Sequence, residues 1–94
     1  MSLLFQILVS PGCAGIDSNW MDAFMEACDL LDCRIDYIAT HEYLKVGQEQ
    51  STMNRLKAYS ERYGGRKIWL TEFAVRNTHE EGDVIGVIEK LLPM

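Results

Sequence analysis

Three short apolar segments, each followed by a stretch with helical periodicity, constrain the fold of this 94-residue chain more than any other feature. The segments are LLFQILV at residues 3–9, RIDYIATH at residues 34–41 and KIWLTEFAV at residues 67–75. Each begins about 30 residues after the one before, which is the length of one strand plus its crossover helix. The order βαβαβα predicts an α/β fold with three parallel strands and right-handed crossovers. Such a unit is three-eighths of a (β/α)₈ barrel or half of a doubly wound domain.

The segments between the strands carry signals for helix starts and ends. Each predicted helix begins at a residue that can cap it: Asp17 or Ser18, Ser51 or Thr52, and Thr78, which forms a capping box with Glu81. The second helix is expected to end at Gly64-Gly65 and the third at Pro93, because glycine accepts a left-handed backbone and proline cannot continue a helix.

The charge and the apolar runs exclude several classes of partner. Nine basic and fourteen acidic residues give a net charge of −5, and the basic residues are scattered, so no nucleic-acid surface is predicted. No apolar run approaches the ~20 residues needed to cross a membrane. The N-terminal stretch lacks a basic region, and we interpret it as a strand rather than a signal peptide. The cellular location is left open.

The three cysteines do not predict a metal site, because no pair has C-x-x-C spacing and the two histidines lie on different elements. No cofactor is predicted either, since the chain has no nucleotide-binding glycine pattern. Cys28 and Cys33 are five residues apart, across a predicted helix-to-strand turn. They could form a disulfide in a secreted protein or remain buried thiols in a cytosolic one, and both alternatives stay open.

Polar side chains gather where the predicted strands end, which is where α/β folds place working residues. The candidates are Ser10, His41, Tyr43 and Glu72. Strict alternation along a strand would place Ile68 and Leu70 on the same face as Glu72, and would direct Trp69 toward the helices. It would also group His41 with Ala39 and turn Glu42 away from them.

Four segments, LVSPGCAG, WMDAFMEAC, CRIDYIATHEY and LKAYSERYGGRKIWLTEFAV, resemble the alkali-sensitive-linkage type glycosyl hydrolases, glycoside hydrolase family 128. That family consists of (β/α)₈ barrels similar to retaining endo-β-1,3-glucanases. The resemblance covers nearly all of this chain but only the last part of the family's catalytic core. It implies that residues 1–94 are a partial catalytic domain, roughly strands five to seven, and that the substrate is a polysaccharide. Family members are often secreted or associated with the cell wall.

The resemblance also implies roles for the candidate residues. Glu72 corresponds to the catalytic nucleophile, His41 and Tyr43 to substrate-binding positions, and Ser10 to the motif that ends strand five. The chain departs from the family at Glu42, where an aromatic residue is usual, and it lacks the Asn-Glu-Pro motif of the acid/base.

A retaining hydrolase needs two carboxyl groups about 5–5.5 Å apart, so the chain is expected to be weak or inactive alone. The alternative is a non-catalytic α/β module that binds carbohydrate or self-associates through its open sheet edges.

Overall fold

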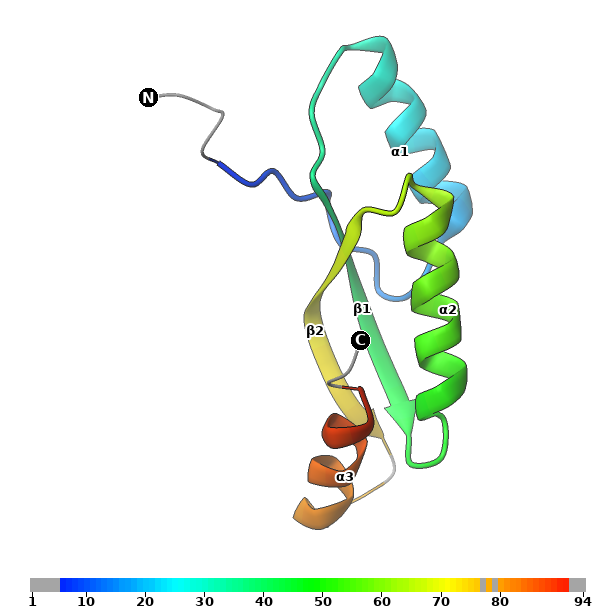
Figure 1. Cartoon of the computed structure of the whole chain (residues 1–94), viewed down its shortest axis with the longest axis vertical. Helices are drawn as coiled ribbons and strands as arrows, with labels where there is room; N and C mark the ends of the chain where they lie inside the picture. The colour runs from blue at the N-terminus through cyan, green and yellow to red at the C-terminus, as the bar shows by residue number, and fades with distance from the viewer. Residues whose placement is uncertain (1–5, 77, 79, 92–94) are drawn as a thin grey trace.

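Two parallel strands and three helices make up the part of the chain that a computed structural model describes, residues 6–76, 78 and 80–91. The elements are α1 (Ser18–Leu30), β1 (Tyr37–Lys45), α2 (Glu49–Arg62), β2 (Lys67–Arg76) and α3 (Glu81–Leu91), as Figure 1 shows. β1 and β2 pair in parallel. The α/β class and the parallel direction of these strands are therefore confirmed, whereas the predicted number of strands is not.

The first predicted strand is wrong in the part that the structure describes. Residues 8–13 run beside β1 and form only isolated parallel bridges, Val9 with Tyr37 and Cys13 with Thr40. Regular pairing would next require the Ala39 amide to bond the Ser10 carbonyl. The Ser10 hydroxyl takes the place of that carbonyl and accepts the Ala39 amide at 3.0 Å. Residues 3–5 of the predicted strand lie outside the described residues.

The first helix begins as predicted, because the side chain of Asp17 accepts a hydrogen bond from the Trp20 amide at 3.0 Å. α2 begins two residues before Ser51, with Gln48 in the cap position and no side-chain cap. Its end is confirmed, since Gly64 and Gly65 have φ values of 73° and 76°, which non-glycine residues rarely adopt.

The predicted capping box of α3 is not formed as expected. The Thr78 hydroxyl accepts the Glu80 amide at 3.1 Å and donates to the Asp83 carboxylate at 2.8 Å, rather than joining Glu81. The predicted stop at Pro93 lies outside the described residues. β2 occupies nearly the predicted range, whereas β1 begins three residues later than predicted and continues to Lys45.

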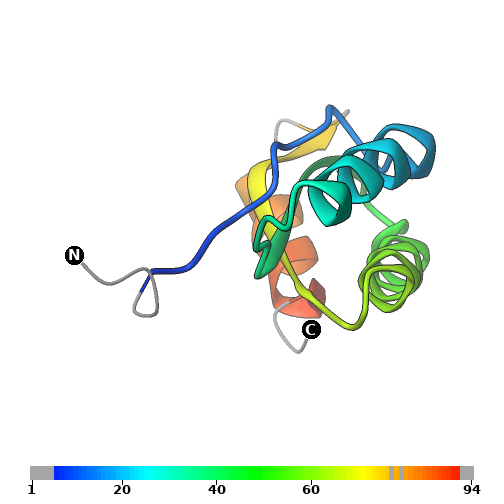
Figure 2. The same ribbon diagram turned by 90° about the horizontal axis from the view of Figure 1, so that it is seen from above.

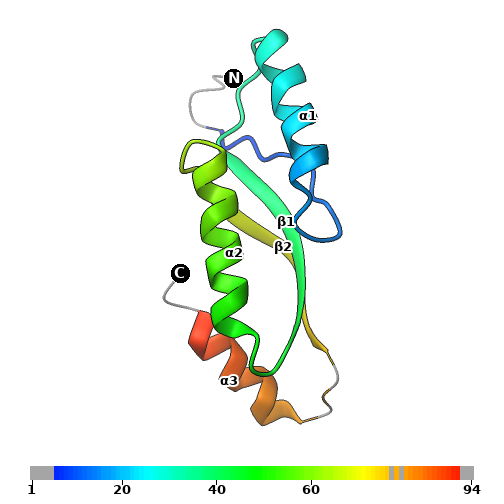
Figure 3. The same ribbon diagram turned by 90° about the vertical axis from the view of Figure 1, so that its right-hand side faces the viewer.

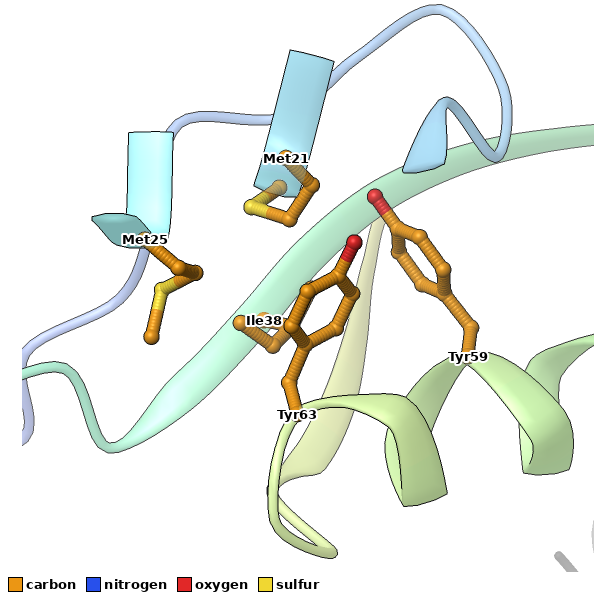
Figure 4. Packing of buried hydrophobic residues seen from close by; sticks show 5 residues of the cluster. All are labelled: Met21, Met25, Ile38, Tyr59 and Tyr63. Carbon is orange, nitrogen blue, oxygen red and sulfur yellow. The ribbon is translucent and has the colours of Figure 1, made fainter. Parts of the chain in front are cut away.

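The helices lie on one face of the two strands (Figures 1 and 2). Met21 and Met25 of α1, Ile38 of β1, and Tyr59 and Tyr63 of α2 are buried against one another, and Figure 4 shows their side chains converging. A second cluster joins α3 to the far end of the sheet, where Figure 3 shows this helix beneath α2. It consists of Leu44, Val87 and Leu91, with Met53, Phe73 and Val75 packed around them.

The opposite face of the strands, which we call the open face, is covered by no helix among the described residues. From β2 it exposes Trp69 and Glu72, and from β1 it presents the partly buried side chains of His41 and Tyr43. In a closed barrel this face would point to the interior, so it is the face on which to look for a site.

A polar cluster ties α1 to α2 beside the first core cluster, and it makes stability depend on pH. Hydrogen bonds from Arg62 and Tyr63 lower the pKa of Asp22 from 3.8 to about 2. A carboxyl whose pKa is lowered by folding stabilises the native state above its unfolded value, and the contribution disappears as pH falls through the folded value.

We therefore expect Asp22→Asn to lower the melting temperature at pH above about 4, and the difference from wild type to shrink as pH falls from about 4 toward about 2. Asp29→Asn, which removes one exposed charge from the same helix, is the control. A difference that is independent of pH would contradict the ionic origin of the effect.

Candidate active site

Glu72 lies on the open face, directly opposite His41 in the register of the sheet. The hydroxyl of Tyr43 donates a hydrogen bond to Glu72 Oε1, and Nδ1 of His41 lies 3.6 Å from Glu72 Oε2. The Glu72 side chain remains 59% exposed. The structure thus brings three of the four predicted site residues together and leaves their carboxylate accessible to a ligand.

The pKa of Tyr43 depends on this arrangement. Its hydrogen bond to Glu72, together with partial desolvation and the negative charge of that carboxylate, raises the pKa of the Tyr43 phenol above 10.0. We expect Glu72→Gln to lower the pKa of Tyr43, because the amide removes the negative charge that opposes phenolate formation.

The measurement is an ultraviolet titration of the phenol, with Tyr43→Phe identifying its contribution among the four tyrosines. Glu42→Gln, on the other face of the sheet, should leave this titration unchanged. An identical curve for wild type and Glu72→Gln would contradict the contact.

A β-bulge on β2 explains how Glu72 reaches the open face. Thr40 pairs with Leu70 but His41 pairs with Glu72, so Thr71 is an extra residue in β2. Ile68 accordingly packs with the helices, and Trp69 is 44% exposed on the face of Glu72, edge-on to Tyr37 with ring centroids 5.1 Å apart. The prediction that Ile68 and Leu70 share the face of Glu72 is wrong, because the bulge shifts the alternation by one residue.

Ser10 lies at the edge of the site, but its hydroxyl is already occupied. The residue is 5% exposed, and its oxygen accepts the Ala39 amide at 3.0 Å and donates to the Pro11 carbonyl at 3.1 Å. In the structure its role is to anchor residues 10–13 across the open face. Its burial leaves the hydroxyl little access to a substrate, so the predicted contact between Ser10 and a substrate stays a prediction.

Glu42 points to the helix face, as alternation along β1 predicts. Its carboxylate is 2.7 Å from the Arg55 guanidinium of α2, and its side chain is 6% exposed. This carboxyl group is therefore turned away from Glu72 and cannot serve as its acid/base partner.

Cys28 and Cys33 are joined in the structure, with their Cα atoms 5.1 Å apart, a separation that is normal for a disulfide. The bond closes the turn after α1 and lies away from Glu72. Cys13 is the free cysteine among the described residues. Within the same residues no group of three or more His, Cys, Asp or Glu side chains could hold a metal ion.

A hollow lies elsewhere, between α2 and the start of β2. It has a volume of about 830 Å³ and is lined by Met53, Lys57, Ser60, Lys67 and Ile68 among others. None of the predicted site residues lines it. It is a groove on the helix side, and we assign it no role in the chemistry of Glu72.

Two residues near Glu72 were missed by sequence reasoning. Thr71 forms the bulge, and Gly12 lies so close to His41 that a side chain would touch the ring. Gly12 follows the candidate Ser10 by two residues and Thr71 precedes the candidate Glu72, but nothing in the sequence pattern indicates that the two residues meet.

Comparison with known proteins gives two matches. The family model described as glycosyl hydrolase catalytic core matches residues 5–93. Alkali-sensitive linkage protein 1 of Schizosaccharomyces pombe is 41% identical over 71 residues, which are 74% of this chain and 12% of that protein. The chain thus corresponds to a small part of its relative. No solved structure matches significantly. No helix among the described residues is long and apolar enough to cross a membrane.

Proposed function

The chain belongs to the glycosyl hydrolase catalytic core family, as its resemblance predicted, and from this membership we propose that Glu72 is the nucleophile of a retaining hydrolase of β-1,3-glucan. The observation that carries the proposal is the carboxylate of Glu72, which is accessible on the open face, accepts a hydrogen bond from Tyr43 and lies beside His41. We further propose that residues 1–94 form part of a catalytic domain, near strands five to seven of its barrel.

The chemistry follows from the two oxygens of Glu72. One carboxylate oxygen attacks the anomeric carbon while the bond from that carbon to the leaving oxygen breaks, which gives a covalent glycosyl-enzyme. The hydrogen bond from Tyr43 fixes one edge of the carboxylate, so that the group is oriented before the substrate arrives. Water then cleaves the intermediate and releases the sugar with its original configuration.

The second carboxyl group that this mechanism needs is not found beside Glu72 among the described residues. Glu42 is bound to Arg55 on the other face. Without an acid, an ordinary sugar leaving group departs as an alkoxide, which is slow. We therefore propose that the 94 residues alone hydrolyse unactivated glucan weakly or not at all.

An activated substrate tests the nucleophile separately from the missing acid. The dinitrophenyl glycoside of a β-1,3-linked glucose disaccharide, fluorinated at C2 to slow hydrolysis of the intermediate, has a leaving group that needs no proton. Glu72 should displace dinitrophenolate and become covalently glycosylated. Mass spectrometry of the peptide that contains Glu72 should reveal the adduct. Absence of an adduct on a folded chain would oppose a nucleophilic role for Glu72.

A second candidate function is favoured by the aromatic pair formed by exposed Trp69 and half-buried Tyr37. Aromatic faces bind the apolar faces of sugar rings, so the open face could bind a polysaccharide without cleaving it. The edge of β2 that pairs with no strand among the described residues could equally join a second copy of the chain. Binding of β-1,3-glucan that persists in Glu72→Gln, with no adduct in wild type, would favour this binding module over the hydrolase.

A further inference from the structure

Gly12 lies over the open face at the point where three side chains meet. A β-carbon built on Gly12 would lie 3.2 Å from Thr71 Oγ1, 3.4 Å from His41 Nε2 and 3.6 Å from Ala39 Cβ. A methyl group there would require the Thr71 oxygen to yield by a few tenths of an ångström and would come into van der Waals contact with the His41 ring. Gly12 therefore lies on the Nε2 side of the ring, and Ser10, buried and hydrogen-bonded to β1, anchors the segment next to it.

The bulge gives the His41 ring its remaining neighbours. In a regular strand, consecutive side chains point to opposite faces. Here Thr71 and Glu72 are consecutive, yet both are exposed and both reach the neighbourhood of the same imidazole. Glu72 lies on the Nδ1 side at 3.6 Å, whereas the Gly12 position lies on the Nε2 side, with Thr71 beside it. The ring thus lies between the Glu72 carboxylate and the segment that contains Gly12.

We propose that Gly12 and Thr71 are positioning residues that hold the imidazole of His41 with Nδ1 toward Glu72. The proposal rests on the proposed function only in taking Glu72 as the reacting carboxylate. In this arrangement His41 acts on Glu72 rather than on the substrate, because its second nitrogen faces Gly12. This assignment differs from the substrate-binding role that the family resemblance implied for His41.

The tautomer of His41 provides a direct test that needs no enzymatic activity. A carboxylate beside Nδ1 favours the neutral tautomer with its proton on Nδ1, and this ratio can be measured by nitrogen NMR of the imidazole at a pH where the ring is neutral. Because Gly12 lies on the Nε2 side, we expect the methyl group of Gly12→Ala to press the ring toward Glu72 and to raise the ratio of the Nδ1–H to the Nε2–H form about twofold. This is less than the roughly fivefold effect between two unit charges about 4 Å apart in water, because both tautomers are neutral.

Gly15→Ala is the matched control. Gly15 lies in the same loop, and no atom is found within 4 Å of a β-carbon built there. Neither glycine has a left-handed backbone, so alanine adds a methyl group without backbone strain at both positions. We expect the His41 spectrum of Gly15→Ala to match wild type. His41→Gln identifies the His41 signals.

A second variant keeps the test decisive if Gly12→Ala does not fold. Thr71→Ala removes the oxygen nearest to the Gly12 position and should lower the tautomer ratio about twofold by loosening the ring. In the double variant the new methyl group has more space, so the ratio should fall below that of Gly12→Ala and return close to the wild-type value. Restoration by the second substitution would support a steric coupling through Thr71.

The proposal is overturned if Gly12→Ala and Gly15→Ala give the same His41 spectrum, or if Thr71→Ala leaves the ratio unchanged where Gly12→Ala is unfolded. Failure of the proposed function is a separate result. It would appear as absence of the glycosyl adduct in a wild-type protein whose His41 still responds to the substitution at Gly12.

Discussion

Replacing Glu72 with alanine is expected to lower the rate of glycosyl transfer from the activated disaccharide to the protein by on the order of 10³-fold or more. The expectation follows from the mechanism, because the carboxylate supplies the electron pair that forms the new bond. With a dinitrophenolate leaving group, no proton donor can compensate for this loss. The release of dinitrophenolate, followed by its absorbance, measures the rate.

Azide provides a positive control for the same variant. It is small enough to enter the space left by the Glu72 side chain, and it can attack the anomeric carbon in place of the carboxylate. The product expected from a substrate without fluorine is the glycosyl azide of α configuration, because azide attacks from the face that Glu72 occupied. Formation of this product would show that the sugar binds correctly and that only the nucleophile is absent.

Glu42→Gln is the matched carboxylate control for this prediction. Glu42 is one position beyond His41 in β1, but it is 5% exposed and paired with Arg55 on the helix face. We expect its substitution to affect stability rather than the transfer rate. Equal transfer rates for wild type and Glu72→Ala would contradict the assignment, as would loss of transfer in a folded Glu42→Gln protein.

Ile38→Ala is expected to destabilise the protein by about 2–5 kcal/mol, the range for truncating a buried aliphatic side chain. Ile38 is completely buried between α1 and α2, where it contacts Met21 and the two tyrosines of the first core cluster. A 94-residue domain has a free energy of unfolding of about 5–14 kcal/mol, so this single change would remove a large part of it. Unfolding in urea, followed by circular dichroism, measures the loss.

Two further substitutions calibrate the result. Ile38→Val removes one methyl group and should cost about 0.5–1.5 kcal/mol. Ile85→Ala makes the same change as Ile38→Ala in chemical terms, but at a side chain of α3 that is 49% exposed. Its effect should be much smaller. Similar losses for Ile38→Ala and Ile85→Ala would indicate that Ile38 does not lie in a common core.

Helices and strands were predicted correctly from the sequence where residues close together in the chain determine the structure. The periodic apolar residues of α1, its cap at Asp17 and the double glycine after α2 act within a few residues of chain, and all are found in the structure. β2 was placed to within one residue because its apolar and β-branched residues favour a strand strongly.

Predictions from the sequence were wrong where the structure depends on contacts between two segments that are distant in the chain. Residues 3–9 have the composition of a strand, but the described part pairs with β1 only at isolated positions. The alternation rule placed Trp69 with the helices, since it assumes that every residue of a strand is paired. The extra residue at Thr71 is a property of the register between β1 and β2, which no local pattern encodes.

The candidate site was likewise predicted only in part. His41, Tyr43 and Glu72 were predicted to meet, because the topology of parallel strands places their ends together. The contact of Gly12 with the ring of His41 depends on the path of a loop, so it could be found only in three dimensions.

The exposed Trp69 also gives the protein an optical reporter of its open face. Indole fluorescence shifts to shorter wavelength when water is excluded, and Trp69 is 44% exposed on the face that carries Glu72. The chain has two tryptophans, and Trp20 stacks on Phe24 of α1, so replacing Trp20 by phenylalanine would isolate the signal of the open face. Its emission would then distinguish a bare sheet from one covered by sugar, by a second copy or by the rest of a barrel, without any label.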